Sequence, residues 1–238
     1  MSVEIVETNL DFSSLSERSY TDMIVIHHTG CNDMDASAEQ IHGWHLSNGW
    51  AGIGYHYVIR KDGTIERGRP EWAIGSHAYG ENSHTIGIHL SGDFEQAEPT
   101  NQQIEKCAML VADICERYSI PIDYDHIVGH GEIMATSCPG KNLQKLIDDG
   151  TITGKAAWYY NQEHGITAET NTLEPDGGKQ GGRGQERYNT VDSLPDWAKP
   201  TISKMIDKGL LNGNGESLDL SLDMLRIFVV NDRAGLYK

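Results

Sequence analysis

The sequence lacks the features that would place it in a membrane or on nucleic acid. No apolar run approaches the roughly 18 residues that a membrane-spanning helix requires. Lysine and arginine total 19 against 35 aspartates and glutamates, for a net charge of −16, and they form no basic stripe. Proteins that bind nucleic acids or anionic membranes usually carry such a stripe. We therefore expect neither nucleic-acid nor membrane partners.

Cysteine is also scarce, and the four that are present do not suggest disulfides. Cys107 and Cys115 fall in one helical pattern, about 12 Å apart along the axis, which is too far for a disulfide bond. Residues 1–7 have neither the basic nor the apolar segment of a secretory signal. These absences predict a protein made and kept in the cytoplasm unless something else releases it.

The chain is long enough for one good core and a small accessory unit. Its character changes after residue 160, and residues 176–184 form a polar stretch dominated by glycine. We expect a domain at 1–160, a flexible linker at 161–187 and a small helical module at 188–238. Two amphipathic helices, at 196–208 and 221–231, would make a weak core alone, so the module is expected to need a partner surface.

Several secondary-structure elements are predicted in the first domain. Asp62-Gly63 between β-prone runs predicts a hairpin. Thr100 and Gln103 form a capping box that opens the clearest helix, which Pro121 ends. The remaining patterns predict strands at 3–6, 23–26, 54–60, 64–67, 85–90 and 127–128 and helices at 35–47 and 141–148.

A metal-binding pattern stands out among the histidines. His130 and Cys138 lie eight positions apart across a short irregular connection, so their donor atoms can meet at one point. His27, at the end of the buried strand 23–26, would be the third ligand, because ligand sites often lie at the carboxyl ends of strands. Two histidines and one cysteine, with a fourth position for water, are typical of catalytic zinc.

This pattern leaves alternatives open. His28 is adjacent to His27 and points to the opposite face if the strand continues, so it is a second choice as ligand. On the simpler interpretation, His130 is a loop histidine and Cys138 a buried free thiol. A carboxylate or carbonyl is expected to hold each zinc imidazole, but the sequence does not identify it.

Six segments, in one order along the chain, carry a specific resemblance. Together they resemble the zinc-dependent N-acetylmuramoyl-L-alanine amidases, a family that includes phage lysozymes with amidase activity and the peptidoglycan recognition proteins. The matching segments are residues 24–30, 41–46, 49–59, 75–78, 85–88 and 130–139.

The resemblance implies a fold, a site and a reaction. The fold is α/β, with a mixed central β-sheet flanked by helices and a cleft over the zinc. His27, His130 and Cys138 would bind the zinc, and Tyr55 would act beside it. The substrate would be peptidoglycan, cut by a zinc-activated water at the amide between N-acetylmuramic acid and L-alanine. Zinc lowers the pKa of its bound water toward about 7.

One catalytic position departs from the family pattern. Thr136 stands where many phage members carry a lysine two positions before the zinc cysteine. A neutral hydroxyl donates a weaker hydrogen bond to an oxyanion than an ammonium does. We expect Thr136 to act as a weaker donor and the reaction to depend more on Tyr55.

Other polar residues near these motifs have two interpretations each. His77 lies where relatives line the substrate cleft, and the alternative is a solvated loop. His45 and His56 are expected to pack or to support ligands rather than act directly. Glu132 is either a general base or a solvated loop charge.

The tail resembles one surface-layer-homology-like repeat in its first half. Residues 188–192, 196–198 and 209–213 carry this resemblance, together with Ile202 and Ile206. In the second half, Ser221-Leu222 replaces the Thr-Arg pair whose arginine would contact anionic wall polymer. We therefore expect residues 188–238 to self-associate and make a homo-oligomer, with wall binding as the alternative.

Taken together, these features predict an endolysin or autolysin that stays in the cytoplasm until lysis and then acts on the cell wall. One alternative is a protein that binds peptidoglycan without cutting it. Cys138 argues against this, because non-catalytic relatives commonly lose that ligand. Another is a cytoplasmic amidase that recycles soluble muropeptides, against which the linker and tail argue.

Overall fold

The structure, a computed structural model, divides the chain into two compact units, Met1–Gly165 and Ile166–Lys238. It describes residues 3–164, 187–195, 197–211, 218, 220–221, 224–225, 228–229 and 232. The glycine-rich stretch at 176–184 and most of the expected helix at 221–231 lie outside these residues. No helix in the described ranges is both long enough and apolar enough to cross a membrane.

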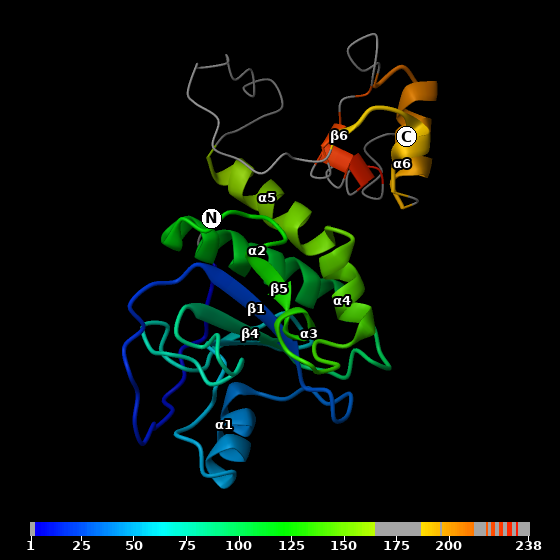
Figure 1. Cartoon of the computed structure of the whole chain (residues 1–238). Helices are drawn as coiled ribbons and strands as arrows, with labels where there is room; N and C mark the ends of the chain where they lie inside the picture. The colour runs from blue at the N-terminus through cyan, green and yellow to red at the C-terminus, as the bar shows by residue number, and fades with distance from the viewer. Residues whose placement is uncertain are drawn as a thin grey trace. The chain divides into compact units, whose positions relative to one another are not determined.

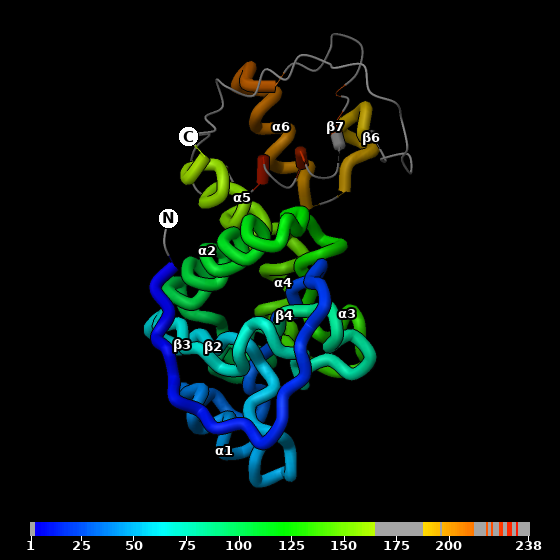
Figure 2. Tube along the Cα trace, turned by 90° about the vertical axis from the view of Figure 1, so that its left-hand side faces the viewer, coloured from blue at the N-terminus to red at the C-terminus, as the bar shows by residue number. Residues whose placement is uncertain are grey.

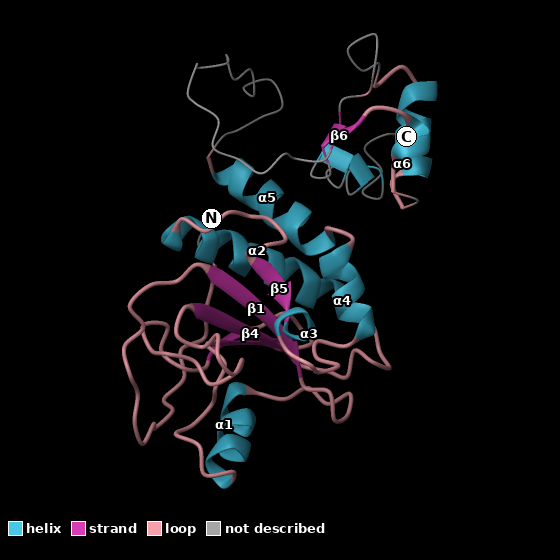
Figure 3. Cartoon of the chain, in the orientation of Figure 1, coloured by secondary structure: helices cyan, strands magenta, loops and turns pink. Residues whose placement is uncertain are grey.

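The first unit is built on a mixed five-stranded sheet (Figure 3). In spatial order its strands are β3 (Ile65–Arg67), β2 (Tyr57–Ile59), β4 (Thr85–Leu90), β1 (Met23–His28) and β5 (Ile127–Gly129). The β2–β3 pair is antiparallel, as the hairpin at Asp62-Gly63 predicts, and the other pairs are parallel. The carboxyl ends of β1, β4 and β5 therefore meet at one edge.

Helices cover the two faces of this sheet unequally (Figure 1). On one face lie α2 (Asn101–Tyr118), α4 (Lys141–Asp148) and α5 (Thr151–Glu163), and on the other lies α1 (Ala38–Ser47). The predicted α/β fold, with a mixed central sheet flanked by helices, is confirmed.

The alternation of side chains along the strands separates two cores. Ile24 and Ile26 of β1 pack under α2 with Ile86, Ile88 and Leu90 of β4 in the main core. The opposite face carries a smaller core in which Val58 of β2 meets Ile41 of α1. Because His27 follows Ile26, its side chain lies on the α1 face, and that face holds the site described below.

Capping fixes the helix starts close to their predicted positions. Thr100 and Gln103 exchange hydrogen bonds as the expected capping box of α2. Ser37 and Gln40 do the same for α1, which therefore begins at Ala38 rather than at residue 35.

Three parts of the first unit differ from expectation. The strand expected at 3–6 is reduced to a single bridge between Val6 and Glu66, and Figure 2 shows this N-terminal segment running past β3. A short helix, α3 (His130–Ile133), occupies part of the expected irregular connection. Helix α5, for which the sequence gives no expectation, continues past residue 160, the expected end of the domain.

The second unit has a core of its own. Its described elements are β6 (Arg187–Tyr188), the 3-10 helix η1 (Val191–Ser193), α6 (Lys199–Asp207) and β7 (Leu220–Ser221), with β6 and β7 antiparallel. Ile202 and Leu225 are fully buried in a cluster that includes Tyr188, Leu194 and Leu220. Side chains of β6, α6 and β7 therefore share one core, and the expected need for a partner surface stays a prediction.

Candidate functional site

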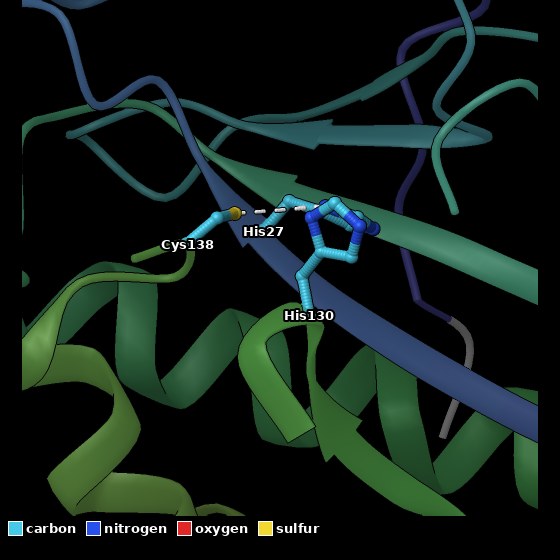
Figure 4. A group of neighbouring side chains, drawn as sticks. All are labelled: His27, His130 and Cys138. Carbon is cyan, nitrogen blue, oxygen red and sulfur yellow. Dashed lines mark hydrogen bonds between the residues drawn. The ribbon is translucent and has the colours of Figure 1, made fainter. Parts of the chain in front are cut away.

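Three side chains from separate parts of the first unit converge above the carboxyl edge of the sheet (Figure 4). His27 comes from the end of β1, His130 from the start of α3, directly after β5, and Cys138 from the following loop. One donor atom from each lies within 4.8 Å of the other two. Among the described residues, this is the one cluster of at least three His, Cys, Asp or Glu side chains with such geometry.

The distances within this cluster fit a zinc ion. The Sγ of Cys138 lies 3.6 Å from Nδ1 of His27. Zinc–sulfur and zinc–nitrogen bonds at a tetrahedral angle would separate these atoms by about 3.5 Å. Two imidazoles and a thiol are also the donor types that zinc takes. The residues present therefore fit the ion that the donor pattern suggests.

The environment of Cys138 affects its thiol in two opposing ways. Burial raises the pKa of the Cys138 thiol to about 12, while a hydrogen bond from the backbone N–H of His28 opposes this shift. That N–H lies 3.4 Å from Sγ. Without a metal the sulfur is a protonated thiol, and the N–H is placed to stabilise the thiolate that a metal requires.

Hydrogen bonds distinguish the remaining histidines from the ligand candidates. The Nδ1 atom of His28 accepts the backbone N–H of Phe94 at 3.1 Å, so His28 lies outside the cluster. Three further histidines each accept a backbone N–H through Nδ1, so each satisfies a backbone group. They are His42, His45 and His56, which accept from Ile53, Gly54 and Gly87.

Glu132 holds the helix that presents His130. Its Oε1 accepts the backbone N–H of Gly129 at 2.7 Å and the side-chain amide of Gln144 at 2.8 Å. These bonds close the first turn of α3, directly at His130. Glu132 is therefore an exposed carboxylate that caps α3, and its interpretation as a general base stays a hypothesis.

Tyr55 lies beside the cluster. Its ring centroid is 5.0 Å from that of His27 and 4.8 Å from that of His89. Burial, followed by the nearby Cys138, raises the pKa of the Tyr55 hydroxyl. The hydroxyl therefore stays protonated and can donate a hydrogen bond.

Thr136 is exposed on the loop that carries Cys138. Its Oγ1 accepts the backbone N–H of Cys138 at 3.2 Å. Because Oγ1 acts as an acceptor there, the hydroxyl keeps its proton for another partner.

His77 is not on a solvated loop. Its side chain is only 9% exposed, and its Nδ1 lies 3.0 Å from Nε2 of His27. The predicted contact between His77 and substrate stays a prediction, but the contact with His27 was not foreseen.

His89 was also missed. In the β1–β4 register it lies directly beside His27, and its Nε2 is 3.2 Å from Oγ1 of Thr29. Its signal in the sequence was the alternation in β4, where Thr85, Gly87 and His89 lie between residues of the main core.

Comparisons with known proteins agree with this site. Residues 17–141, which span every ligand candidate, match the family described as N-acetylmuramoyl-L-alanine amidase. The endolysin of Enterobacteria phage K11 is 30% identical over 143 residues, covering 58% of this chain and 92% of the endolysin. Peptidoglycan-recognition protein SC2 of Drosophila melanogaster is 34% identical over 138 residues, covering 55% of this chain and 74% of that protein.

A solved structure agrees as well. The N-acetylmuramoyl-L-alanine amidase LysC from Clostridium intestinale is 41% identical, with a TM-score of 0.55, and the match covers 59% of this chain and 91% of LysC. The family match falls within the unit that holds the cluster. The chain belongs to the N-acetylmuramoyl-L-alanine amidase family.

Proposed function

We propose that this protein is an endolysin-type amidase that hydrolyses the amide between N-acetylmuramic acid and L-alanine in peptidoglycan. His27, His130 and Cys138 would hold a zinc ion in the reaction site. The observation that carries the proposal is the convergence of these three donors within 4.8 Å, beside Tyr55, in a chain of this family.

The reaction requires stabilisation of the negative charge that develops on the carbonyl oxygen. In amide hydrolysis, the C–N bond breaks, the oxygen of water bonds to the carbonyl carbon, and a proton passes to the leaving nitrogen. A bound zinc ion would supply Lewis acidity and an acidified water. Tyr55, protonated and adjacent to His27, would donate to the carbonyl oxygen as negative charge develops there.

Thr136 is the second donor in this proposal. It is exposed on the loop of Cys138, and its oxygen is already oriented by the backbone N–H of that residue. A neutral hydroxyl is a weaker donor to an oxyanion than an ammonium. We therefore expect Tyr55 to supply the larger share of the stabilisation.

The alternatives are weaker on specific observations. Peptidoglycan-recognition proteins are among the relatives, so binding without cleavage is a second candidate. The complete set of three donors favours the enzyme, because pure binding does not need a thiol beside two imidazoles. A protein that recycles soluble muropeptides would have no evident use for the second unit, which favours an insoluble wall as substrate.

We propose that the enzyme acts on the cell wall after release at lysis. The relative from Enterobacteria phage K11 is an endolysin, which supports this route. The acidic charge, −16 overall, gives no electrostatic attraction to an anionic wall polymer, so binding must come from other contacts of the amidase unit or from the second unit.

Metal analysis with a matched pair of cysteine variants tests the proposal. Protein purified without chelator should contain one zinc per chain, and Cys138→Ala should lose both the metal and wall hydrolysis. Cys31→Ala is the control, because Cys31 is an exposed free thiol and not part of the donor cluster. A Cys138→Ala protein that hydrolyses walls at the rate of the Cys31→Ala control would rule the site out.

A further inference from the structure

A chain of polar contacts leads from His27 into the protein, away from Cys138. Nε2 of His27 lies 3.0 Å from Nδ1 of His77. On the far side of the ring, Nε2 of His77 lies 3.5 Å from Oγ1 of Thr85, the first residue of β4. The Thr85 hydroxyl in turn donates to the backbone carbonyl of Glu81 at 2.8 Å.

The hydrogen bond from Thr85 to Glu81 determines which atom is the donor in each of the other contacts. A hydroxyl has one proton, and that of Thr85 is given to Glu81. Only its lone pairs can face His77, so His77 must carry its proton on Nε2 and present a lone pair on Nδ1. His27 must then carry its own proton on Nε2, which leaves the lone pair of Nδ1 directed at the cluster, 3.6 Å from Cys138 Sγ.

The protein makes room for the His77 ring at this place. A Cβ atom on Gly87 of β4 would lie 2.6 Å from Cδ2 of His77, and one on Gly75 would lie 2.5 Å from the same atom. Real Cβ contacts do not come this close, so two glycines form a cradle for the ring.

We infer that His77 is a positioning residue that, together with Thr85, fixes His27 as the Nε2–H tautomer and so assigns Nδ1 of His27 as the metal-binding atom. The inference rests on the proposed function for its metal, but the tautomer is a property of the protein alone. An imidazole thus takes the place usually occupied by a carboxylate or backbone carbonyl behind a metal-binding histidine. His77 acts through His27 and is not itself a ligand.

Nitrogen-15 NMR of the imidazoles in metal-free full-length protein tests the tautomer directly. Long-range couplings distinguish a protonated Nδ1 from a protonated Nε2. We expect His27 and His77 both to carry the proton on Nε2. A proton on Nδ1 of either ring overturns the inference. This measurement needs no variant and no bound zinc, so a failure of the proposed function would not affect it.

Two substitutions then measure the effect on metal binding, by competition for zinc with a chromophoric chelator. His77→Leu removes the acceptor and should weaken zinc binding about 10- to 100-fold, the usual loss when such a supporting residue is removed. His77→Asn places a side-chain oxygen near the position of Nδ1 and should restore most of that loss.

The outcomes separate a positioning role from simple packing. Leucine fills the cradle better than asparagine, so packing alone would make His77→Asn the poorer binder. Equal zinc affinity in His77→Leu and the unmodified protein would also overturn the inference. If the unmodified protein binds no zinc at all, the proposed metal is wrong, while the NMR result still decides the tautomer.

Discussion

Tyr55 and Glu132 illustrate how single residues near one another can have different tasks. Tyr55 lies against His27 with a hydroxyl that stays protonated, so its value is as a hydrogen-bond donor. Glu132 uses its carboxylate to cap α3 and so to present His130. Substitutions that change a single polar group distinguish hydrogen-bond donation by Tyr55 from helix capping by Glu132.

Tyr55→Phe should lower turnover of peptidoglycan about 100- to 1,000-fold while the protein keeps its zinc. The ring remains and only the hydroxyl is lost, which is the usual effect of removing one donor to an oxyanion. Wall clearing and zinc content, measured on the same preparation, check this. Unchanged turnover would remove Tyr55 from the mechanism.

Glu132→Gln should retain nearly full turnover. Its amide oxygen can still accept the backbone N–H of Gly129, so the cap of α3 survives without the charge. Glu132→Ala loses that acceptor and should lower the free energy of unfolding by about 1 kcal/mol. Turnover and thermal melts on both variants check this. A general base would instead lose its activity in Glu132→Gln, and that result would contradict the capping role.

At the scale of secondary structure, the parallel arrangement of β1, β4 and β5 assembles the site. It brings the ends of strands that are distant in sequence to one edge, where His27 and His130 meet. The opposite ends of β1 and β4 are tied by His84, which precedes β4 and contacts Asp22, directly before β1. His84 Nδ1 lies 2.5 Å from Asp22 Oδ1, and Nε2 lies 2.8 Å from Glu81 Oε2.

This tie makes stability depend on pH in a predictable direction. Partial burial opposes a charge on His84, but the hydrogen bonds to Asp22 and Glu81 outweigh it and raise the pKa of His84 above its ordinary value of 6.5. The charged form is favoured by folding, so the stabilisation is complete below pH 6.5 and is lost as pH rises through the raised pKa.

His84→Gln should therefore destabilise the protein more at pH 5.5 than at pH 8.5. The difference should be about 0.5–1 kcal/mol, in the range of partly exposed ion pairs. Urea unfolding at the two pH values measures it. His126→Gln is a useful comparison, because His126 contacts a single carboxylate, that of Asp123. An equal effect of His84→Gln at both pH values would show that the pair is not charged in the fold.

The elements that the sequence predicts well are those with local signals. The hairpin at Asp62-Gly63 and the Thr100 cap depend on neighbouring residues, and both occur as expected. Helix α5 depends instead on distant partners, since Tyr159 and Lys155 both bind Glu105 of α2. Helix α3 is a single turn, too short for a periodic pattern, and needs the cap from Glu132.

The site follows the same division between local and distant signals. The family motifs, together with the spacing of His130 and Cys138, point to the donor cluster. The position of His77 behind His27 could not be predicted, because it depends on the space left by Gly75 and Gly87. The alternation along β4 places Gly87 on the correct face, but it does not say which ring fills the space.

At the scale of the whole molecule, the second unit raises the question of how the enzyme meets an insoluble substrate. The unit buries its own core, yet Trp197 and Leu210 remain 36% and 54% exposed. Exposed apolar side chains of this size suit contact with another protein surface better than contact with a polar, anionic polymer. An oligomer that carries several catalytic units would raise the effective concentration of those units at a wall.

We predict that residues 188–238 self-associate, so the full chain is an oligomer while a chain ending at Gly165 is a monomer. Light scattering on the two proteins checks this, and Leu210→Ser should shift the full chain toward the monomer. Monomers in both cases, with only the full chain sedimenting with walls, would make the second unit a wall-binding module instead.

The identity of the bond that is cut tests the central claim most directly. Purified peptidoglycan should be digested with the full-length protein, and the new end groups should be identified. The account predicts that free amino groups on L-alanine increase as the wall suspension clears, and that no new reducing sugar ends appear. New reducing ends, or wall clearing without free L-alanine amino groups, would contradict the assignment as an amidase.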